Sequence, residues 1–179
     1  MANDLWRTPK QVFNRLNSEF NFVADIAASE ENALCEVFYT EEDNSLSVDD
    51  WAREVFPFGK VTSLKYLWCN PPYSDLMPWV KLANRIQRQG VGVVMLLNND
   101  MSVGWFAEAL KGASEIRCII ADTAPESKRG YSSGRLAFLN ENGEPVSGNN
   151  RPQFVLVFNP FKIGANATSY VRRSEFYKN

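Results

Sequence analysis

Histidine is absent from this chain of 179 residues, and cysteine is scarce, with only Cys35, Cys69 and Cys118 present. The absence of histidine excludes a Ser-His-Asp triad, a Cys-His pair and the commonest general base of enzymes. The three cysteines are widely spaced and form no CxxC pair, which argues against a disulfide framework and a Cys/His zinc site. We therefore expect no metal site, and any chemistry must rely on carboxylates, amides, aromatic rings or a bound cofactor.

Long apolar runs are also absent. No stretch is long enough to cross a bilayer, and the first residues contain no apolar signal segment, so we expect a cytoplasmic protein with no membrane partner. The net charge of −2 provides no overall basic field, and a polyanionic partner would need a local basic patch. Because no G-x-G-x-x-G motif occurs, a nicotinamide dinucleotide site has little support.

The composition is that of a globular protein with a substantial core. Hydrophobic residues make up 45% of the chain and aromatic residues 13%, which is enough for one packed domain of this length. No internal repeat, low-complexity tract or linker divides the sequence. We therefore treat residues 1–179 as a single domain.

Strand and helix patterns alternate along the first two thirds of the chain. Thr8 as N-cap and Pro9 at the first helical position predict a helix over about residues 9–18. Further helical patterns lie near residues 30–34, around Trp51 after a Ser47/Asp50 capping box, from Ser74 to about residue 88, and after Ser102. Strands are expected at residues 20–24, 37–39, 66–69, 91–97 and 116–121.

The last third differs, because two strand patterns, at residues 135–139 and 153–158, follow each other without a helix between them. Alternation followed by consecutive strands predicts an α/β fold: a mostly parallel open sheet with an antiparallel edge and helices on both faces. In such sheets, ligands bind beyond the carboxyl ends of the strands. Polar residues at or just after predicted strand ends are Asp25, Asp43, Asn70 and residues 98–100, and all could line one crevice.

The most unusual strand end is Asn70-Pro71-Pro72-Tyr73, which follows the apolar residues Leu67-Trp68-Cys69. Proline has no N–H, fixes φ, and moves the preceding residue away from helical conformation, so this turn is stiff. It holds an amide oxygen, a proline carbonyl and an aromatic face in a constant relation, which suits the binding of a flat ring with an exocyclic amine. The alternative is a plain turn with a packed tyrosine.

Two acidic residues follow other predicted strands. Asp25 precedes the small residues Ala27 and Ala28, which permit close approach of a ligand, and its carboxylate could accept hydrogen bonds from a cationic or hydroxylated cofactor. The alternative is that Asp25 only caps the next helix. Asp43 lies where nucleotide-binding folds place an acid on ribose hydroxyls, or else in a solvated acidic loop.

An ordered series of short motifs resembles the phage-type DNA N6-adenine methyltransferases, the Dam-like group. It begins with Trp6-Arg7-Thr8-Pro9, Val12-Phe13, Leu16, Glu19-Phe20, Phe22, Asp25, Ala27-Ala28-Ser29, Asn32-Ala33 and Cys35. It continues with Phe38, Thr40, Glu42-Asp43-Asn44, Leu46, Asp50-Trp51, Asn70-Pro71-Pro72-Tyr73-Ser74, Trp79-Val80, the 91–97 strand, Trp105-Phe106, Arg135, Phe138 and residues 155–160. The resemblance covers nearly the whole chain in order.

This resemblance implies a Rossmann-like methyltransferase fold that transfers a methyl group from S-adenosylmethionine to adenine N6 in double-stranded DNA. Asn70, Pro71, Pro72 and Tyr73 would be catalytic: the Asn70 oxygen and the Pro71 carbonyl would accept the amine protons, and Tyr73 would stack on an adenine flipped out of the duplex. The cofactor would contact Trp6, Thr8, Pro9, Asp25, Ala27, Ala28 and Asp43. If a phage encodes the chain, it would act in the cytoplasm of the bacterial host.

The chain is too short for a large, separate target-recognition domain, so DNA contacts must come from loops. The best candidate is the loop at residues 122–134, together with the neighbouring Arg135, and its cations Lys128 and Arg129 would contact DNA. The alternative for these cations is a solvated surface loop. Other open alternatives are methylation of RNA or of a protein glutamine amide, and a non-catalytic methyltransferase-like binding module. The recognised DNA sequence and the oligomeric state cannot be predicted from these motifs.

Overall fold

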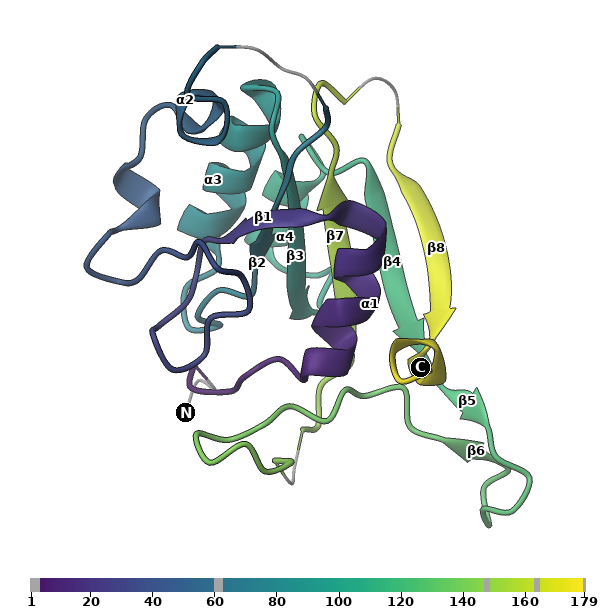
Figure 1. The fold of residues 1–179 in the computed structure, drawn as a ribbon. Helices are drawn as coiled ribbons and strands as arrows, with labels where there is room; N and C mark the ends of the chain where they lie inside the picture. The colour runs from purple at the N-terminus through teal and green to yellow at the C-terminus, as the bar shows by residue number, and fades with distance from the viewer. Residues whose placement is uncertain (1–3, 60–62, 147–148, 163–164, 179) are drawn as a thin grey trace.

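A six-stranded sheet forms the centre of the computed structural model, which describes residues 4–59, 63–146, 149–162 and 165–178. Its strands follow the spatial order β1-β2-β3-β7-β4-β8 (Figure 1). In chain order they are β1 (Phe22–Asp25), β2 (Tyr66–Cys69), β3 (Gly92–Asn98), β4 (Glu115–Ile120), β7 (Gln153–Phe158) and β8 (Ala167–Arg172). A separate small hairpin pairs β5 (Asp122–Thr123) with β6 (Tyr131–Ser132).

Five strands run in one direction and β7 runs against them. β1, β2 and β3 pair in parallel, as do β4 and β8, whereas β7 is antiparallel to both β3 and β4. The prediction of a mostly parallel sheet is confirmed, but the antiparallel strand is not at the edge. All residues of β7 are buried, so its apolar run needs neighbours on both sides, whereas the edge strand β8 alternates between exposed and half-buried residues.

Helices cover both faces of the sheet, as predicted. On one face lie α1 (Lys10–Phe20) and the short 3-10 helix η2 (Arg173–Phe176), whose buried residues join one apolar cluster. On the other face lie α2 (Trp51–Val55), α3 (Met77–Arg88) and α4 (Gly104–Ala109), with a second cluster (Figure 1). The inward residues of α1 are those with helical spacing: Val12, Phe13, Leu16 and Phe20.

Two of the predicted strands are not formed. Residues 37–39 make only a single bridge, Asp25 with Phe38, and residues 135–139 are extended but make only isolated bridges at Leu139. The segment near residues 30–34 is a turn rather than a helix. These segments are short, so neighbouring chain rather than intrinsic propensity decides their conformation.

Helix capping also differs from the prediction. Thr8 does not cap α1, because Pro9 occupies the N-cap position and no side chain bonds to the first turn. Ser74 and Ser102 lie ahead of the caps of α3 and α4, which are Leu76 and Val103. The Ser47/Asp50 capping box is not formed either, because Asp50 rather than Ser47 is the N-cap of α2, where its side chain accepts a 2.9 Å hydrogen bond from the Arg53 N–H.

The carboxyl ends of the parallel strands meet at one end of the sheet. Figure 1 shows this end facing the segment of residues 133–146, which crosses below it, and the projecting β5–β6 hairpin. Among the described residues, no helix is long and apolar enough to span a membrane.

Candidate active site

The Asn70-Pro71-Pro72-Tyr73 turn begins directly after β2, at the carboxyl end of the sheet. Pro71 is buried, Pro72 is exposed, and Asn70 and Tyr73 are half-buried. Asn70 and Pro72 line a cavity of about 1150 Å³, which opens beside the ends of β1 and β2. The turn therefore presents its first and third residues to a space large enough for a small-molecule ligand.

The Tyr73 hydroxyl faces the protein interior. Its oxygen lies 3.1 Å from the Asn70 Oδ1 atom and 3.1 Å from the Leu96 carbonyl oxygen in β3. Burial raises the pKa of Tyr73 far above its usual range, so the hydroxyl keeps its proton. The ring packs edge-on against Phe138, with centroids 6.4 Å apart at 89°. Both ends of the tyrosine side chain are thus held in place.

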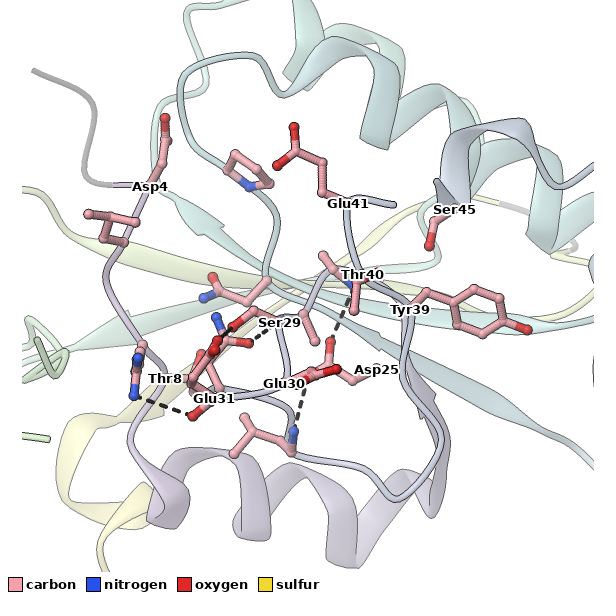
Figure 2. A pocket seen from close by; sticks show the side chains of 18 of the residues that line it. Asp4, Thr8, Asp25, Ser29, Glu30, Glu31, Tyr39, Thr40, Glu41 and Ser45 are labelled. Carbon is pink, nitrogen blue, oxygen red and sulfur yellow. Dashed lines mark hydrogen bonds between the residues drawn. The ribbon is translucent and has the colours of Figure 1, made fainter. Parts of the chain in front are cut away.

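Four separate segments of the chain surround the cavity. Side chains come from the N-terminal segment (residues 4–8), the loop that begins at the end of β1 (residues 25–34), the segment of residues 39–46 and the turn after β2 (Figure 2). The fold brings together, along this lining, the predicted site residues Trp6, Thr8, Asp25, Ala27, Ala28, Asn70 and Pro72. Pro9, Pro71, Tyr73 and Asp43 are not part of the lining.

Asp25 is a buried carboxylate in the cavity wall, only 3% exposed. Its oxygens accept 3.3 Å hydrogen bonds from the Ala27 N–H and the Leu34 N–H. Burial raises the pKa of Asp25 from 3.8 to about 6, and the two backbone hydrogen bonds oppose this rise. Asp25 therefore holds the ends of the loop together and changes charge near neutral pH.

Asp43 has a local role instead. It is exposed, and its Oδ2 accepts 2.8 Å hydrogen bonds from the Thr40 N–H and the Thr40 hydroxyl. These bonds lower the pKa of Asp43. The predicted ribose contact at Asp43 is not supported by this position. Its neighbours Glu41 and Glu42 do line the cavity. The sequence pattern did not distinguish them from Asp43, because all three acids lie in one polar stretch.

The wall of the cavity is strongly acidic. Arg7 is the one basic side chain among its described residues, against the carboxylates of Asp4, Asp25, Glu30, Glu31, Glu41, Glu42 and Glu141. Figure 2 shows that Asp4, Asp25 and Glu41 come from different segments. Carboxylates around a concave space favour a cationic ligand and disfavour phosphates.

The N-terminal segment contributes an aromatic residue and an unpaired hydroxyl. Trp6 packs on Phe138, with ring centroids 5.8 Å apart, and Arg7 forms a backbone bridge to Leu139. Thr8 is 6% exposed and lines the cavity, but its Oγ1 has no hydrogen-bond partner. A buried hydroxyl without a partner in a cavity wall indicates a place where a ligand can bind.

The predicted DNA-contacting cations lie outside the cavity. Lys128 and Arg129 are exposed at the tip of the β5–β6 hairpin, and Arg135 is exposed on the segment that follows it. That segment is held by the fully buried Gln153, whose Oε1 accepts a 3.2 Å hydrogen bond from the Leu136 N–H. None of the described residues that line the cavity belongs to the β5–β6 hairpin. Figure 1 shows the hairpin projecting from the end of β4.

Comparison with known proteins agrees with this geometry. The family model for "DNA N-6-adenine-methyltransferase (Dam)" matches residues 1–179. The DNA N-6-adenine-methyltransferase of Escherichia phage T1 is 38% identical over 175 residues, 95% of this chain and 69% of the relative. That of Haemophilus phage HP1 is 35% identical over 177 residues, 96% of this chain and 88% of the relative. The chain belongs to the DNA N-6-adenine-methyltransferase (Dam) family.

Proposed function

We propose that this chain transfers a methyl group from S-adenosylmethionine to the N6 amine of adenine in double-stranded DNA. The observation that carries this proposal is the cavity of about 1150 Å³ that Asn70 and Pro72 share with the acidic loop after β1. An acceptor turn for an amine and a wall suited to a cation therefore face one space. The membership of the chain in the Dam family supports the same activity.

The residues of the cavity fit the methyl donor. S-adenosylmethionine carries a sulfonium and an ammonium group against a single carboxylate and is a net cation, and the described wall has one basic side chain against seven acidic ones. The unpaired Thr8 Oγ1 offers a further polar contact. We assign the donor to Trp6, Thr8, Asp25, Ala27 and Ala28. Pro9 would act by positioning Thr8, and Asp43 by holding the Thr40 turn beside Glu41 and Glu42.

When bound, the donor supplies a methyl carbon activated by positive sulfur, which becomes a neutral thioether as the carbon bonds to nitrogen. The protein has to make the amine nucleophilic, because its lone pair is delocalised into the purine ring. The Asn70 oxygen and the Pro71 carbonyl would accept the two N–H bonds and turn the lone pair toward the methyl group. No histidine base is required, since the N6 proton becomes acidic after transfer and passes to water.

The target adenine would reach the turn only after leaving the base stack. The half-buried Tyr73 ring, held edge-on by Phe138, would provide a flat surface for it. Lys128, Arg129 and Arg135 would contact DNA phosphates from the hairpin side, because the acidic cavity wall repels the backbone. In this arrangement the hairpin of residues 122–134 positions the duplex and the turn selects the amine.

Methyl transfer from labelled S-adenosylmethionine tests the proposal directly. We expect label in N6-methyladenine of unmethylated duplex DNA, and a loss of at least about 100-fold in Asn70→Ala. Asn99→Ala, at the end of the neighbouring strand and outside the cavity, is a matched control that should keep its activity. RNA and a glutamine-containing peptide are offered in parallel. Label in either of these but not in DNA would overturn the proposal, as would cofactor binding without transfer to any substrate.

A further inference from the structure

The catalytic turn interrupts the hydrogen-bond ladder between β2 and β3. In this parallel pair Gly92 stands opposite Tyr66, and the Gly92 N–H donates to the Lys65 carbonyl at 2.8 Å. In a parallel pair, every second residue of a strand directs its N–H and C=O groups toward the same neighbouring strand. Val94 and Leu96, like Gly92, therefore direct these groups toward β2. Cys69 is opposite Met95, and continuing this register places Asn70 opposite Leu96. The donor for the Leu96 carbonyl would then be the N–H of residue 71.

Residue 71 is proline and has no N–H to donate. Leu96 is fully buried, so its carbonyl oxygen needs another partner. The Tyr73 hydroxyl lies 3.1 Å from this oxygen and replaces the missing backbone donor. The tyrosine of the turn therefore repairs the gap in the ladder that the proline creates.

This repair has a consequence for Asn70. A hydroxyl has one proton, and a backbone carbonyl can only accept, so the Tyr73 proton is committed to Leu96. The Asn70 amide is 3.1 Å from the same hydroxyl, where it is placed with Oδ1 facing the tyrosine. Two acceptors cannot share this single proton. Because the two ends of an amide have the same shape, hydrogen bonding decides which end faces the hydroxyl.

We infer that the Asn70 amide is turned so that Nδ2 donates to the Tyr73 oxygen. A chain of hydrogen bonds then runs from the Asn70 Nδ2–H to the Tyr73 hydroxyl and on to the Leu96 carbonyl. The Asn70 oxygen faces the cavity that this residue lines, with its lone pairs available for an amine. Tyr73 is thus a positioning residue, in addition to the stacking surface proposed for its ring. This inference rests on the proposed function only for the identity of the amine.

Tyr73→Phe tests the inference because it keeps the ring and removes only the hydroxyl. We expect kcat to fall about tenfold, since the amide is no longer held with its oxygen toward the amine, while KM for DNA changes less than about twofold. The matched control is Tyr66→Phe on the same β2 strand. It removes a 2.7 Å hydrogen bond from a tyrosine hydroxyl to Asn159 Oδ1 and should leave kcat unchanged. Equal losses of kcat in both variants would indicate a general structural effect and overturn the inference.

A second measurement does not depend on turnover. The side-chain NH₂ signals of Asn70, assigned by their loss in Asn70→Ala, are followed by NMR in protein labelled with ¹⁵N-asparagine. We expect one Asn70 amide proton to be hydrogen-bonded in the native protein and to shift in Tyr73→Phe but not in Tyr66→Phe. Unchanged signals in Tyr73→Phe would disprove the orientation even if the enzyme methylates adenine. Conversely, full activity of Asn70→Ala would disprove the proposed role of the turn in catalysis. The NMR signals would still determine the orientation of the Asn70 amide, so the two failures can be distinguished.

Discussion

The Ser45 hydroxyl donates a 2.7 Å hydrogen bond to the Ile26 carbonyl oxygen and so joins two segments that are 19 residues apart. Ser45 is 2% exposed and begins the 3-10 helix η1 (Ser45–Ser47), and it also lines the cavity. Ile26 directly follows β1, and its N–H donates to the Trp68 carbonyl of β2 at 3.0 Å. This wall of the cavity is therefore fixed to the sheet itself.

Ser45→Ala should weaken this wall. We expect a loss of about 1 kcal/mol in the free energy of unfolding and a several-fold weaker affinity for S-adenosylmethionine, because the Ile26 carbonyl loses its partner. Urea denaturation and calorimetry measure the two effects. Ser47→Ala is the control, since the exposed Ser47 hydroxyl bonds only to the nearby Asn44 carbonyl. Equal affinity in both variants would contradict the role given to Ser45.

Asp25 should make stability depend on pH. Its pKa is about 6 in the native state against 3.8 for an unperturbed carboxyl. Between these values the native state holds a proton that the unfolded chain has lost, so stability falls as pH rises through this window. The full penalty, about 3 kcal/mol, applies above pH 6. Relative to the parent chain, Asp25→Asn should therefore gain stability between pH 4 and pH 8.

Urea denaturation of both proteins at several pH values measures this difference. The control is Asp43→Asn, because hydrogen bonds lower the pKa of Asp43 and its contribution has the opposite sign: it is present above the unfolded pKa and lost as pH falls. A difference between Asp25→Asn and the parent that does not change with pH would show that Asp25 does not titrate in this range.

Affinity for the methyl donor should rise as Asp25 loses its proton, because the ionised carboxylate attracts the cationic ligand. We expect the dissociation constant to fall as pH increases through about 6, and Asp25→Asn should abolish most of this dependence. Calorimetric titration at pH 5 and pH 7.5 checks this expectation. The neutral thioether product, which lacks the sulfonium charge, should show a smaller pH effect, and an equal effect would argue against charge attraction.

The hairpin cations should contribute to DNA affinity and not to cofactor affinity. In Lys128→Gln/Arg129→Gln, DNA binding should weaken, and the slope of log Kd against log salt should fall by about 1 to 2 because fewer phosphates are neutralised. Fluorescence anisotropy at several salt concentrations measures this slope. Lys111→Gln is the control, because this exposed lysine follows α4 and pairs with Glu108, away from the hairpin. An unchanged slope in the double variant would exclude the hairpin from the interface.

Gly134 should not tolerate a side chain. A Cβ atom there would lie 2.6 Å from the Ile120 carbonyl carbon and 2.8 Å from the Ala121 nitrogen, and neither backbone atom can move freely. Gly134→Ala should therefore cost about 2 kcal/mol of stability and displace the segment that carries Arg135. In Gly104→Ala, the nearest atom to the new Cβ would be 3.8 Å away, so stability should not fall. Thermal unfolding of both variants provides the comparison.

The hydrophobic pattern of the sequence was sufficient to predict the helices and strands that bury an uninterrupted set of apolar side chains. The apolar run that forms β3 and the helical spacing of Val12, Phe13 and Leu16 in α1 leave little choice of structure, because any fold must bury these side chains. The turn at Asn70 was equally predictable, since its two prolines restrict the backbone directly. Of the polar residues predicted at strand ends, Asp25 and Asn70 do line the cavity, whereas Asp43 and residues 98–100 do not.

Strand neighbours and side-chain partners could not be predicted, because they depend on contacts between distant segments. The sequence by itself determined an α/β sheet, a stiff Asn70–Tyr73 turn and an acid at the end of the first strand. Only the tertiary structure decided that β7 lies inside the sheet, that Glu41 and Glu42 rather than Asp43 face the cavity, and that Tyr73 meets Leu96. The physical reason is that Pro71 lacks a backbone N–H donor in any fold, whereas the register of β2 and β3 determines which group replaces that donor.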